Sequence, residues 1–231
     1  MKTSDLTIVA TTYGRLGYKW HKTAEVQLPP YSGSGCSAMF YKMGAEPNTD
    51  DFALKVFGDA DECLASYQRQ ALAFREGVAP PVGRLILVTQ VSSWNNQPYE
   101  VYALETGVCG DLDPSLRQEI GGMPFHEQGN HPFVKALRRS LRRVNLTGTI
   151  LNDVFRCTIR DILVPSGSGI CLGGDLHNKN YMMWRGAPVC IDFGHHAVLT
   201  SRRGRPAPLC DFSCTRAQGA KRVARELGIR A

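Results

Sequence analysis

The sequence lacks the marks of several protein classes. Its eight cysteines include no Cys-x-x-Cys pair, so we expect no structural zinc site and interpret the cysteines as free thiols of a reducing compartment. No run of about 18 apolar residues occurs, so we expect no membrane-spanning helix and no membrane partner. Residues 1–5 are not followed by an apolar segment of the signal-peptide kind. Together these absences predict a cytoplasmic protein.

A net charge is also missing from most of the chain. The 231 residues include 27 Lys and Arg against 21 Asp and Glu, a formal net charge of +6. The whole excess lies in residues 201–231, which carry eight basic and two acidic side chains. The rest of the chain is neutral, which excludes a uniformly basic nucleic-acid-binding protein. We expect no nucleic-acid partner, and a cationic tail that favours acidic protein partners.

What is present is a pattern of strands followed by helices. Apolar residues recur at three- and four-residue spacing over 59–76, which predicts a helix that ends before Gly77 and the Pro80-Pro81 pair. The same spacing predicts helices over 133–144 and 150–162. A β-rich first part joined to a helical second part is an α+β fold. Strands are expected at 39–41, 52–57, 85–88, 101–104, 170–172, 181–184 and 189–191.

The segment from Gly174 to Asn180 carries the most chemical information. Asp175 and Asn180 lie five residues apart on one predicted loop, and Asp192 follows a predicted hairpin. Two oxygen ligands such as Asn180 and Asp192 can hold Mg²⁺ against phosphate oxygens. Asp175 then remains to accept a proton from an attacking hydroxyl.

This arrangement resembles the catalytic segment of protein-kinase-like phosphotransferases. Asp175 and Asn180 match the catalytic-loop pattern D-x-x-x-x-N, and Asp192 matches D-F-G. Residues 33–42 resemble the Gly-rich loop of the same family, and residues 53–55 resemble its V-A-I-K strand. The four motifs follow one another in the family's order.

The resemblance implies a site for ATP and Mg²⁺. Lys55 would pair with the phosphates, Asp175 would activate the acceptor hydroxyl, Lys179 would reach the transferred phosphate, and Asn180 and Asp192 would hold the metal ion. The segment 102–107 would be the hinge between two lobes, with Leu104 as gatekeeper and Asp111 near the ribose. The nucleotide-binding set is Gly33, Ser34, Gly35, Cys36, Ser37, Ala38 (in place of the third glycine), Lys55, Glu62, Leu104, Glu105, Thr106 and Asp111.

The sequence also departs from the family pattern. The side chain that pairs with Lys55 is either Glu62 or Gln70, because the two ways of counting the helix register disagree. Gly173-Gly174 replaces the usual His-Arg of the catalytic loop. The motif Asp175-Leu176-His177 is similar to the D-L-H motif of aminoglycoside phosphotransferases. Only 37 residues follow Gly194. In this abbreviated second half the chain resembles short Ser/Thr kinases encoded by phages.

We therefore expect a bilobal protein-kinase-like fold, with a β-rich N-lobe over 1–105 and an abbreviated helical C-lobe over 106–231. The expected activity is Ser/Thr protein kinase, acting in the cytoplasm (that of the host for a phage protein) on other proteins. Thr200 and Ser201 are candidate autophosphorylation sites beside basic residues. The alternatives are a small-molecule phosphotransferase of the aminoglycoside type and a pseudokinase that only binds a protein partner. The sequence does not predict the oligomeric state.

Overall fold

The computed structural model describes residues 1–14, 17–34, 38–75, 77–92, 94–141, 144–145, 169–171, 180–192, 198–200 and 206–207. It combines helices with a large mixed sheet, as an α+β fold does. The chain divides into two compact units. Unit 1 is Met1–Tyr67, Pro80–Gly110 and Trp184–Gly186, and unit 2 is Gln68–Ala79, Asp111–Met183 and Ala187–Ala231. No helix of the described residues is long and apolar enough to cross a membrane.

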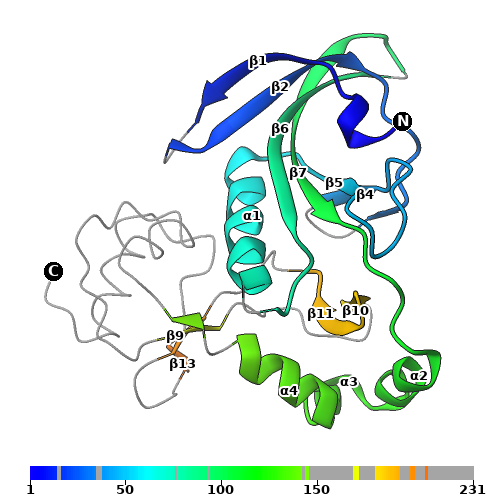
Figure 1. The fold of residues 1–231 in the computed structure, drawn as a ribbon, viewed down its shortest axis with the longest axis vertical. Coiled ribbons are helices and arrows are strands. Elements are labelled where there is room, and N and C mark those ends of the chain that lie inside the picture. Colours follow the sequence, from blue (N-terminus) through cyan, green and yellow to red (C-terminus); the bar gives the residue numbers. More distant parts are fainter. Residues whose placement is uncertain are drawn as a thin grey trace, which may run out of the picture. The chain divides into compact units, whose positions relative to one another are not determined.

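Unit 1 is built on a seven-stranded sheet in the order β1-β2-β6-β7-β5-β4-β3 (Figure 1). Neighbouring strands run antiparallel, except that β2 and β6 are parallel. A short 3-10 helix, η1 (Thr3–Asp5), precedes the sheet. The strands are β1 (Ile8–Tyr13), β2 (Lys19–Val26), β3 (Gly33–Ser34), β4 (Ala38–Tyr41), β5 (Phe52–Phe57), β6 (Val82–Val91) and β7 (Pro98–Gly107).

The four strands predicted in the first half are confirmed as β4, β5, β6 and β7. The sequence reading missed β1 and β2. Five of the six residues of β1 are exposed, so that strand has no buried face and no alternation of apolar and polar residues. Strand β2 lacks a regular alternation as well, because its buried residues Trp20 and Thr23 are three apart. Its register against β6 shifts between Lys22 and Glu25, where the Thr23 hydroxyl accepts a hydrogen bond from the backbone N–H of Thr89 (3.1 Å).

Helix α1 (Ala60–Arg75) confirms the helix predicted over 59–76. Asp59 begins it: its carbonyl accepts the N–H of Cys63 (3.1 Å), and its carboxylate accepts the N–H of Glu62 (2.8 Å). Cys63 and Leu64 pack against the sheet with Trp20, Phe57, Leu85 and Leu104. The other sheet face has its own core, formed by Leu6, Leu28, Tyr41, Met43, Leu54, Val56, Ile86, Val88, Val101 and Ala103.

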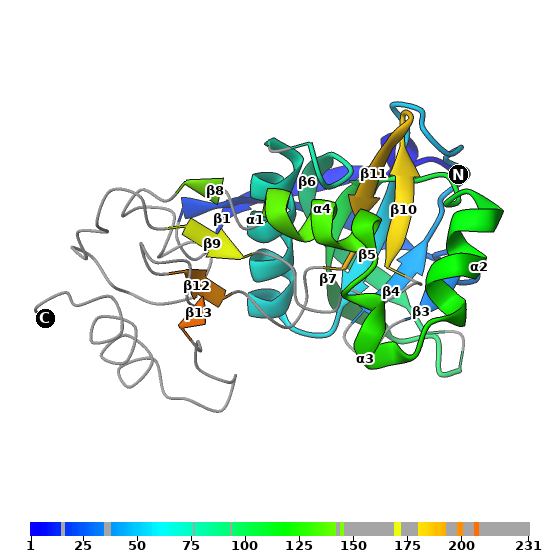
Figure 2. The same ribbon diagram turned by 90° about the horizontal axis from the view of Figure 1, so that it is seen from below.

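Unit 2 holds three short helices, α2 (Pro114–Gly122), α3 (Phe125–Gln128) and α4 (Pro132–Leu141) (Figure 2). It also holds the strand pair β10 (Tyr181–Trp184) and β11 (Ala187–Cys190), except for Trp184, which belongs to unit 1. A second small sheet has the order β13-β12-β9-β8. Its strands are β8 (Val144–Asn145), β9 (Gly169–Cys171), β12 (Val198–Thr200) and β13 (Pro206–Ala207).

The helix predicted over 133–144 is confirmed by α4, and the last three predicted strands by β9, β10 and β11. The predicted helix over 150–162 lies outside the described residues. Helix α2 was not predicted, although Asp113-Pro114 is a typical start of a helix. The Asp113 carboxylate accepts the N–H groups of Ser115 and Leu116, and Pro114 is the first helical residue.

An ion pair between Arg84 and Glu105 joins β6 to β7. Glu105 is buried, and Arg84 binds its carboxylate with Nη2 (2.7 Å), Nε (3.1 Å) and the backbone N–H (2.7 Å). The same guanidinium donates to the carbonyl of Thr3 in η1 (3.1 Å). Gly83 makes room for the pair, since a Cβ there would lie 2.6 Å from Oε2 of Glu105. These hydrogen bonds to Glu105 raise the pKa of Arg84.

Substitution of either partner should destabilise the sheet. Arg84→Ala leaves a buried carboxylate without its charged partner, so we expect it to lower the free energy of unfolding by about 2–4 kcal/mol. Gly83→Ala should destabilise through its clash with the same carboxylate. Urea unfolding followed by tryptophan fluorescence measures both.

The matched control is Lys22→Ala, which removes a cation from the exposed Lys22–Glu100 pair. A surface pair contributes about 0–1 kcal/mol, so this variant should unfold close to wild type. If Arg84→Ala and Lys22→Ala unfold at the same urea concentration, the buried pair does not hold the sheet together.

Candidate functional site

Lys55 lies in the middle of β5, between Phe40 of β4 and Leu104 of β7. Strand alternation puts Lys55 on the same sheet face as Phe57, which packs against helix α1. The Lys55 ammonium lies 5.7 Å from the centroid of the Phe57 ring, a cation–π distance. The predicted phosphate-pairing lysine is therefore half-buried on the helix-facing side of the sheet.

Helix α1 packs Cys63 against the sheet, in one cluster with Phe57. Burial raises the pKa of the Cys63 thiol well above its ordinary value, and the positive charge of Lys55 partly opposes that rise. Glu62, the residue before it, is partly buried. The assignment of Glu62 as the partner of Lys55 stays a prediction. Gln70, the alternative, is buried and lies two turns beyond Cys63 on the same helix face.

The described part of the Gly-rich segment forms the strand pair β3–β4. Gly33 is paired with Phe40 and Ser34 with Met39, and Ala38 begins β4. A Cβ at Gly33 would meet no atom within 4 Å, so space alone does not require glycine there. The predicted phosphate-loop residues Gly35, Cys36 and Ser37 lie outside the described residues.

A small apolar cluster stands beside Lys55. Phe40, the register partner of Lys55, packs on the buried residues Ala45, Ala53 and Val108. Ala53 lies two residues before Lys55 on the same sheet face. Ala45 and Val108 were not in the predicted set, because single apolar residues in connecting segments carry no periodic signal.

The segment predicted as the hinge, 102–107, belongs to strand β7. Strand β7 extends to Gly107, and Leu104 and Thr106 each pair with residues on both neighbouring strands. Leu104 is fully buried, and the carboxylate of Glu105 is bound by Arg84. Glu105 and Thr106 both lie within the sheet ladder, and their assignment to nucleotide binding stays a prediction. A connecting segment begins only at Val108, and the two units divide after Gly110 instead of after 105.

The β10–β11 hairpin brings the two predicted metal ligands to one place. Asn180 precedes β10, and its carbonyl accepts the N–H of Ile191 after β11 (3.1 Å). Asp192 is the next residue, and its carbonyl accepts a hydrogen bond from the Cys190 thiol (3.5 Å). Asn180 is only 9% exposed. Two oxygen-bearing side chains twelve residues apart thus stand at the same end of one hairpin.

Unit 2 fixes this end of the hairpin through Tyr181. The ring of Tyr181 is fully buried and meets Phe133 of α4 edge to face, with centroids 5.8 Å apart. Arg117 of α2 donates to the Tyr181 carbonyl (3.5 Å). Helices α2 and α4 therefore hold the residue that follows Asn180.

Two further predicted residues, Asp111 and Thr200, lie within the described part of the chain. Asp111, assigned to the ribose, is exposed and forms a surface ion pair with Arg117 (3.6 Å). Thr200 ends β12. Asp175, Lys179 and Ser201 lie outside the described residues. Within the described part of the chain, no group of three His, Cys, Asp or Glu side chains could hold a metal ion.

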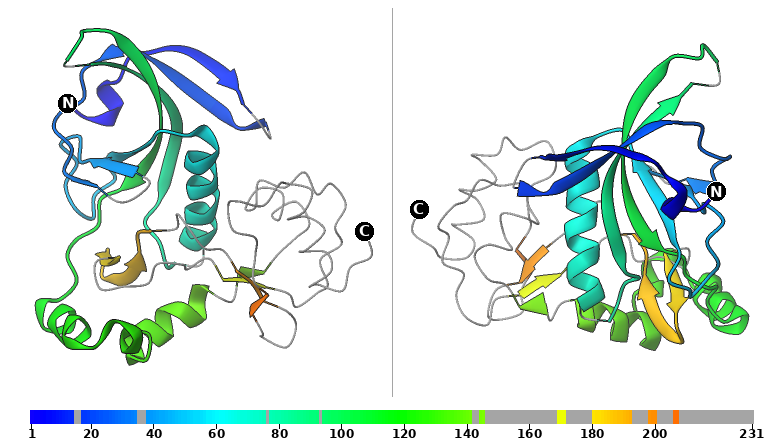
Figure 3. Two further views of the ribbon diagram at one scale, coloured as in Figure 1. Left: turned by 180° about the vertical axis from the view of Figure 1, so that it is seen from behind. Right: turned by 45° about the horizontal axis from the view of Figure 1, so that its top comes forward.

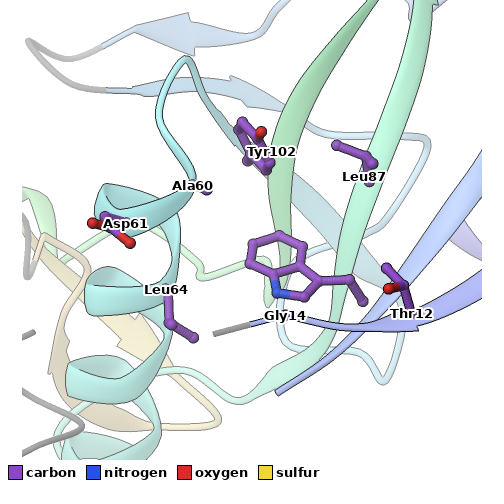
Figure 4. Close-up of a pocket in the computed structure, with 8 residues that line it drawn as sticks. Thr12, Gly14, Ala60, Asp61, Leu64, Leu87 and Tyr102 are labelled. Carbon is purple, nitrogen blue, oxygen red and sulfur yellow. The ribbon is translucent and has the colours of Figure 1, made fainter. Parts of the chain in front are cut away.

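An apolar pocket of about 200 Å³ lies elsewhere on unit 1 (Figure 4). Trp20 and Tyr102 stand edge to face within it, with ring centroids 5.7 Å apart. Its single charged lining residue is Asp61 near the start of α1. None of the predicted nucleotide-site residues lines it. The full lining is Thr12, Gly14, Trp20, Ala60, Asp61, Leu64, Leu87 and Tyr102.

No family model, no curated protein and no solved structure matches the chain. The functional interpretation therefore depends on the chemistry and placement of its own residues.

The hairpin geometry makes a testable prediction about Mg²⁺. We expect Mg²⁺ with a non-hydrolysable ATP analogue to raise the melting temperature of the wild-type protein, because a ligand at about a hundred times its Kd stabilises by about 2.7 kcal/mol. Asp192→Asn should lose the Mg²⁺-dependent part of this shift, because it removes the anionic ligand. The control Asp51→Asn changes an exposed carboxylate that pairs with Lys2, and should keep the full shift. Equal Mg²⁺ shifts in both variants would remove Asp192 from the metal site.

Proposed function

We propose that this protein is an ATP- and Mg²⁺-dependent phosphotransferase, a protein-kinase-like Ser/Thr kinase that acts on proteins, itself included. The observation that carries the proposal is the backbone hydrogen bond between Asn180 and Ile191, which sets Asn180 beside Asp192. Support from unit 1 comes from Lys55, which follows the Gly-rich segment on a central strand and lies beside the first turns of the following helix. The order loop, strand lysine, helix is the order found in protein kinases.

The residues at the end of the hairpin suit Mg²⁺. An amide oxygen from Asn180 and a carboxylate from Asp192 are hard oxygen ligands, and two such ligands leave the remaining positions to water and phosphate oxygens. When bound, the ion would neutralise charge on the phosphates of ATP. Asn180 and Asp192 would hold it, and their place on a hairpin anchored by Tyr181 would keep the two ligands together.

Lys55 would supply the positive charge for the nucleotide phosphates. A lysine ammonium acts as a point charge on phosphate, and it acts more strongly where water is partly excluded. Lys55 stands on a central strand beside the apolar cluster of Phe40 and Ala53. The same apolar surface would suit the uncharged part of a nucleotide.

Asp175 would orient the acceptor hydroxyl and take its proton. In the transfer, the hydroxyl oxygen bonds to the γ-phosphorus while the bond from that phosphorus to the β,γ-bridging oxygen breaks, and ADP leaves. The hydroxyl proton passes to the Asp175 carboxylate. Lys179, four residues later, would stabilise the transferred group.

The proposed acceptors are Ser and Thr of proteins. The cationic stretch 201–231 would favour acidic protein surfaces through its excess of basic side chains. Thr200 and Ser201 stand next to Arg202-Arg203, and phosphate on either could pair with those arginines.

Phosphate transfer should be lost when either key residue is changed. We expect Asp175→Asn to lower transfer by about 10²–10⁴-fold, because the amide cannot accept the hydroxyl proton. Lys55→Ala should lower it as well, through loss of the phosphate-pairing charge. Radiolabelled ATP with a cell lysate measures transfer to other proteins, and intact-mass spectrometry after incubation with Mg-ATP measures self-phosphorylation.

Two matched controls separate chemistry from folding. Lys22→Ala removes an exposed lysine and Asp51→Asn an exposed carboxylate, and both should label proteins as wild type does. Labelling by Asp175→Asn equal to wild type would show that the catalytic assignment is wrong. Thermal stabilisation by ATP without transfer to any acceptor would identify a pseudokinase, and transfer to aminoglycosides but not to proteins would identify the small-molecule enzyme.

A further inference from the structure

Strand β1 forms one end of the seven-stranded sheet (Figure 3). Among the described residues, no strand pairs with its outer side. A strand at the end of a sheet presents backbone N–H and C=O groups that can pair with another chain, and proteins commonly block such edges with charged residues or proline. The β1 sequence Ile8-Val9-Ala10-Thr11-Thr12-Tyr13 contains neither. Five of its six residues are exposed.

The backbone pairing with β2 fixes which groups of β1 point outward. The N–H of Gly14 donates to the carbonyl of Tyr18 (2.8 Å), so this pair is hydrogen-bonded. The register continues through Thr12 opposite Trp20 and Ala10 opposite Lys22. Hydrogen-bonded pairs alternate along an antiparallel ladder, so residues 10, 12 and 14 turn their backbone groups toward β2. Thr11 and Tyr13 therefore turn theirs outward.

This alternation limits how a second strand can pair with β1. Two antiparallel copies exchange hydrogen bonds only where outward-turned residues face each other. Thr11 opposite the partner's Thr11 meets this condition about a two-fold axis. The same register sets Val9 opposite the partner's Tyr13. Val9 lies at the bulge and has no register partner on β2.

The side chains favour the same register. Val9 is 58% exposed and Tyr13 is 72% exposed, the two large apolar residues of β1 that are left to solvent. In the two-fold register, Val9 of each copy faces Tyr13 of the other copy. An aromatic residue opposite a β-branched one stabilises a strand pair. No charged side chain lies on β1, so no like charges meet across the axis.

We propose that β1 is a self-association edge, through which two copies of this chain pair antiparallel with Thr11 on the two-fold axis. The pairing joins the two seven-stranded sheets into one continuous sheet. A closed two-fold contact of this kind uses the same surface on both copies and stops at a dimer. The proposal is independent of the phosphotransferase assignment.

Charge placed at residue 11 tests the proposal. Thr11 is exposed, so Thr11→Lys leaves the monomer fold unchanged but sets two ammonium groups against each other at the axis. By light scattering after size-exclusion chromatography, wild type should show about twice the 25.5 kDa chain mass at high concentration. Thr11→Lys should show half that value, as should Thr11→Glu. An equimolar mixture of the two variants should recover the dimer mass, because opposite charges then face each other.

The control Asn95→Lys adds the same charge in the β6–β7 loop and should leave the mass at that of wild type. A wild-type protein that stays monomeric at every concentration overturns the proposal and leaves the edge open to a different protein. A dimer that persists in both Thr11 variants overturns it as well, because its interface lies elsewhere. A mixture that stays monomeric, after each variant alone is monomeric, shows that residue 11 does not face its own copy.

Discussion

The Arg84–Glu105 pair is the constraint on which the arrangement of unit 1 depends. A buried carboxylate is costly unless it is paired and hydrogen-bonded, and Arg84 meets that need with two guanidinium nitrogens and its own backbone N–H. The pair lies at the register shift between β6 and β7, where the ladder alone does not fix the alignment. Because Gly83 has no Cβ, the two strands can approach each other at this point. The alignment of β7 in turn sets Leu104 opposite Lys55, the lysine of the proposed phosphate site.

The same ion pair bears on the segment predicted as the hinge. Residues 102–107 were assigned to the hinge by the resemblance to protein kinases alone, with a connection expected after Leu104. The sheet instead continues to Gly107, because Glu105 finds its partner within the sheet. Only the structure could reveal this, since Arg84 lies 21 residues away and its pairing depends on a register that periodicity does not define.

Local patterns did predict the parts that depend on local physics. Helix α1 and strands β4 to β7 follow from periodicity and from the Gly and Pro residues that end each element. Strand β1 could not be found this way, because five of its six residues are exposed and its strand partner among the described residues is β2. The partner of Lys55 shows a similar limit: a shift of one helix position decides whether a side chain faces the sheet, and counting along the sequence leaves Glu62 and Gln70 open. In α1, Cys63 is a residue that packs against the sheet.

The hairpin that carries Asn180 and Asp192 shows how residues distant in sequence can converge in the proposed site. A two-residue turn at Arg185-Gly186, both with positive φ, brings together residues twelve apart in sequence. The tip is held by Arg185, which donates to the side chains of Asn48 (2.8 Å) and Asp50 (2.6 Å). The other end is held by the buried Tyr181 ring. Within unit 2, the buried Tyr181 ring and the backbone bond between Asn180 and Ile191 hold the residues proposed as ligands at one end of the strand pair, and this supports the hairpin as the preorganised part of the proposed site.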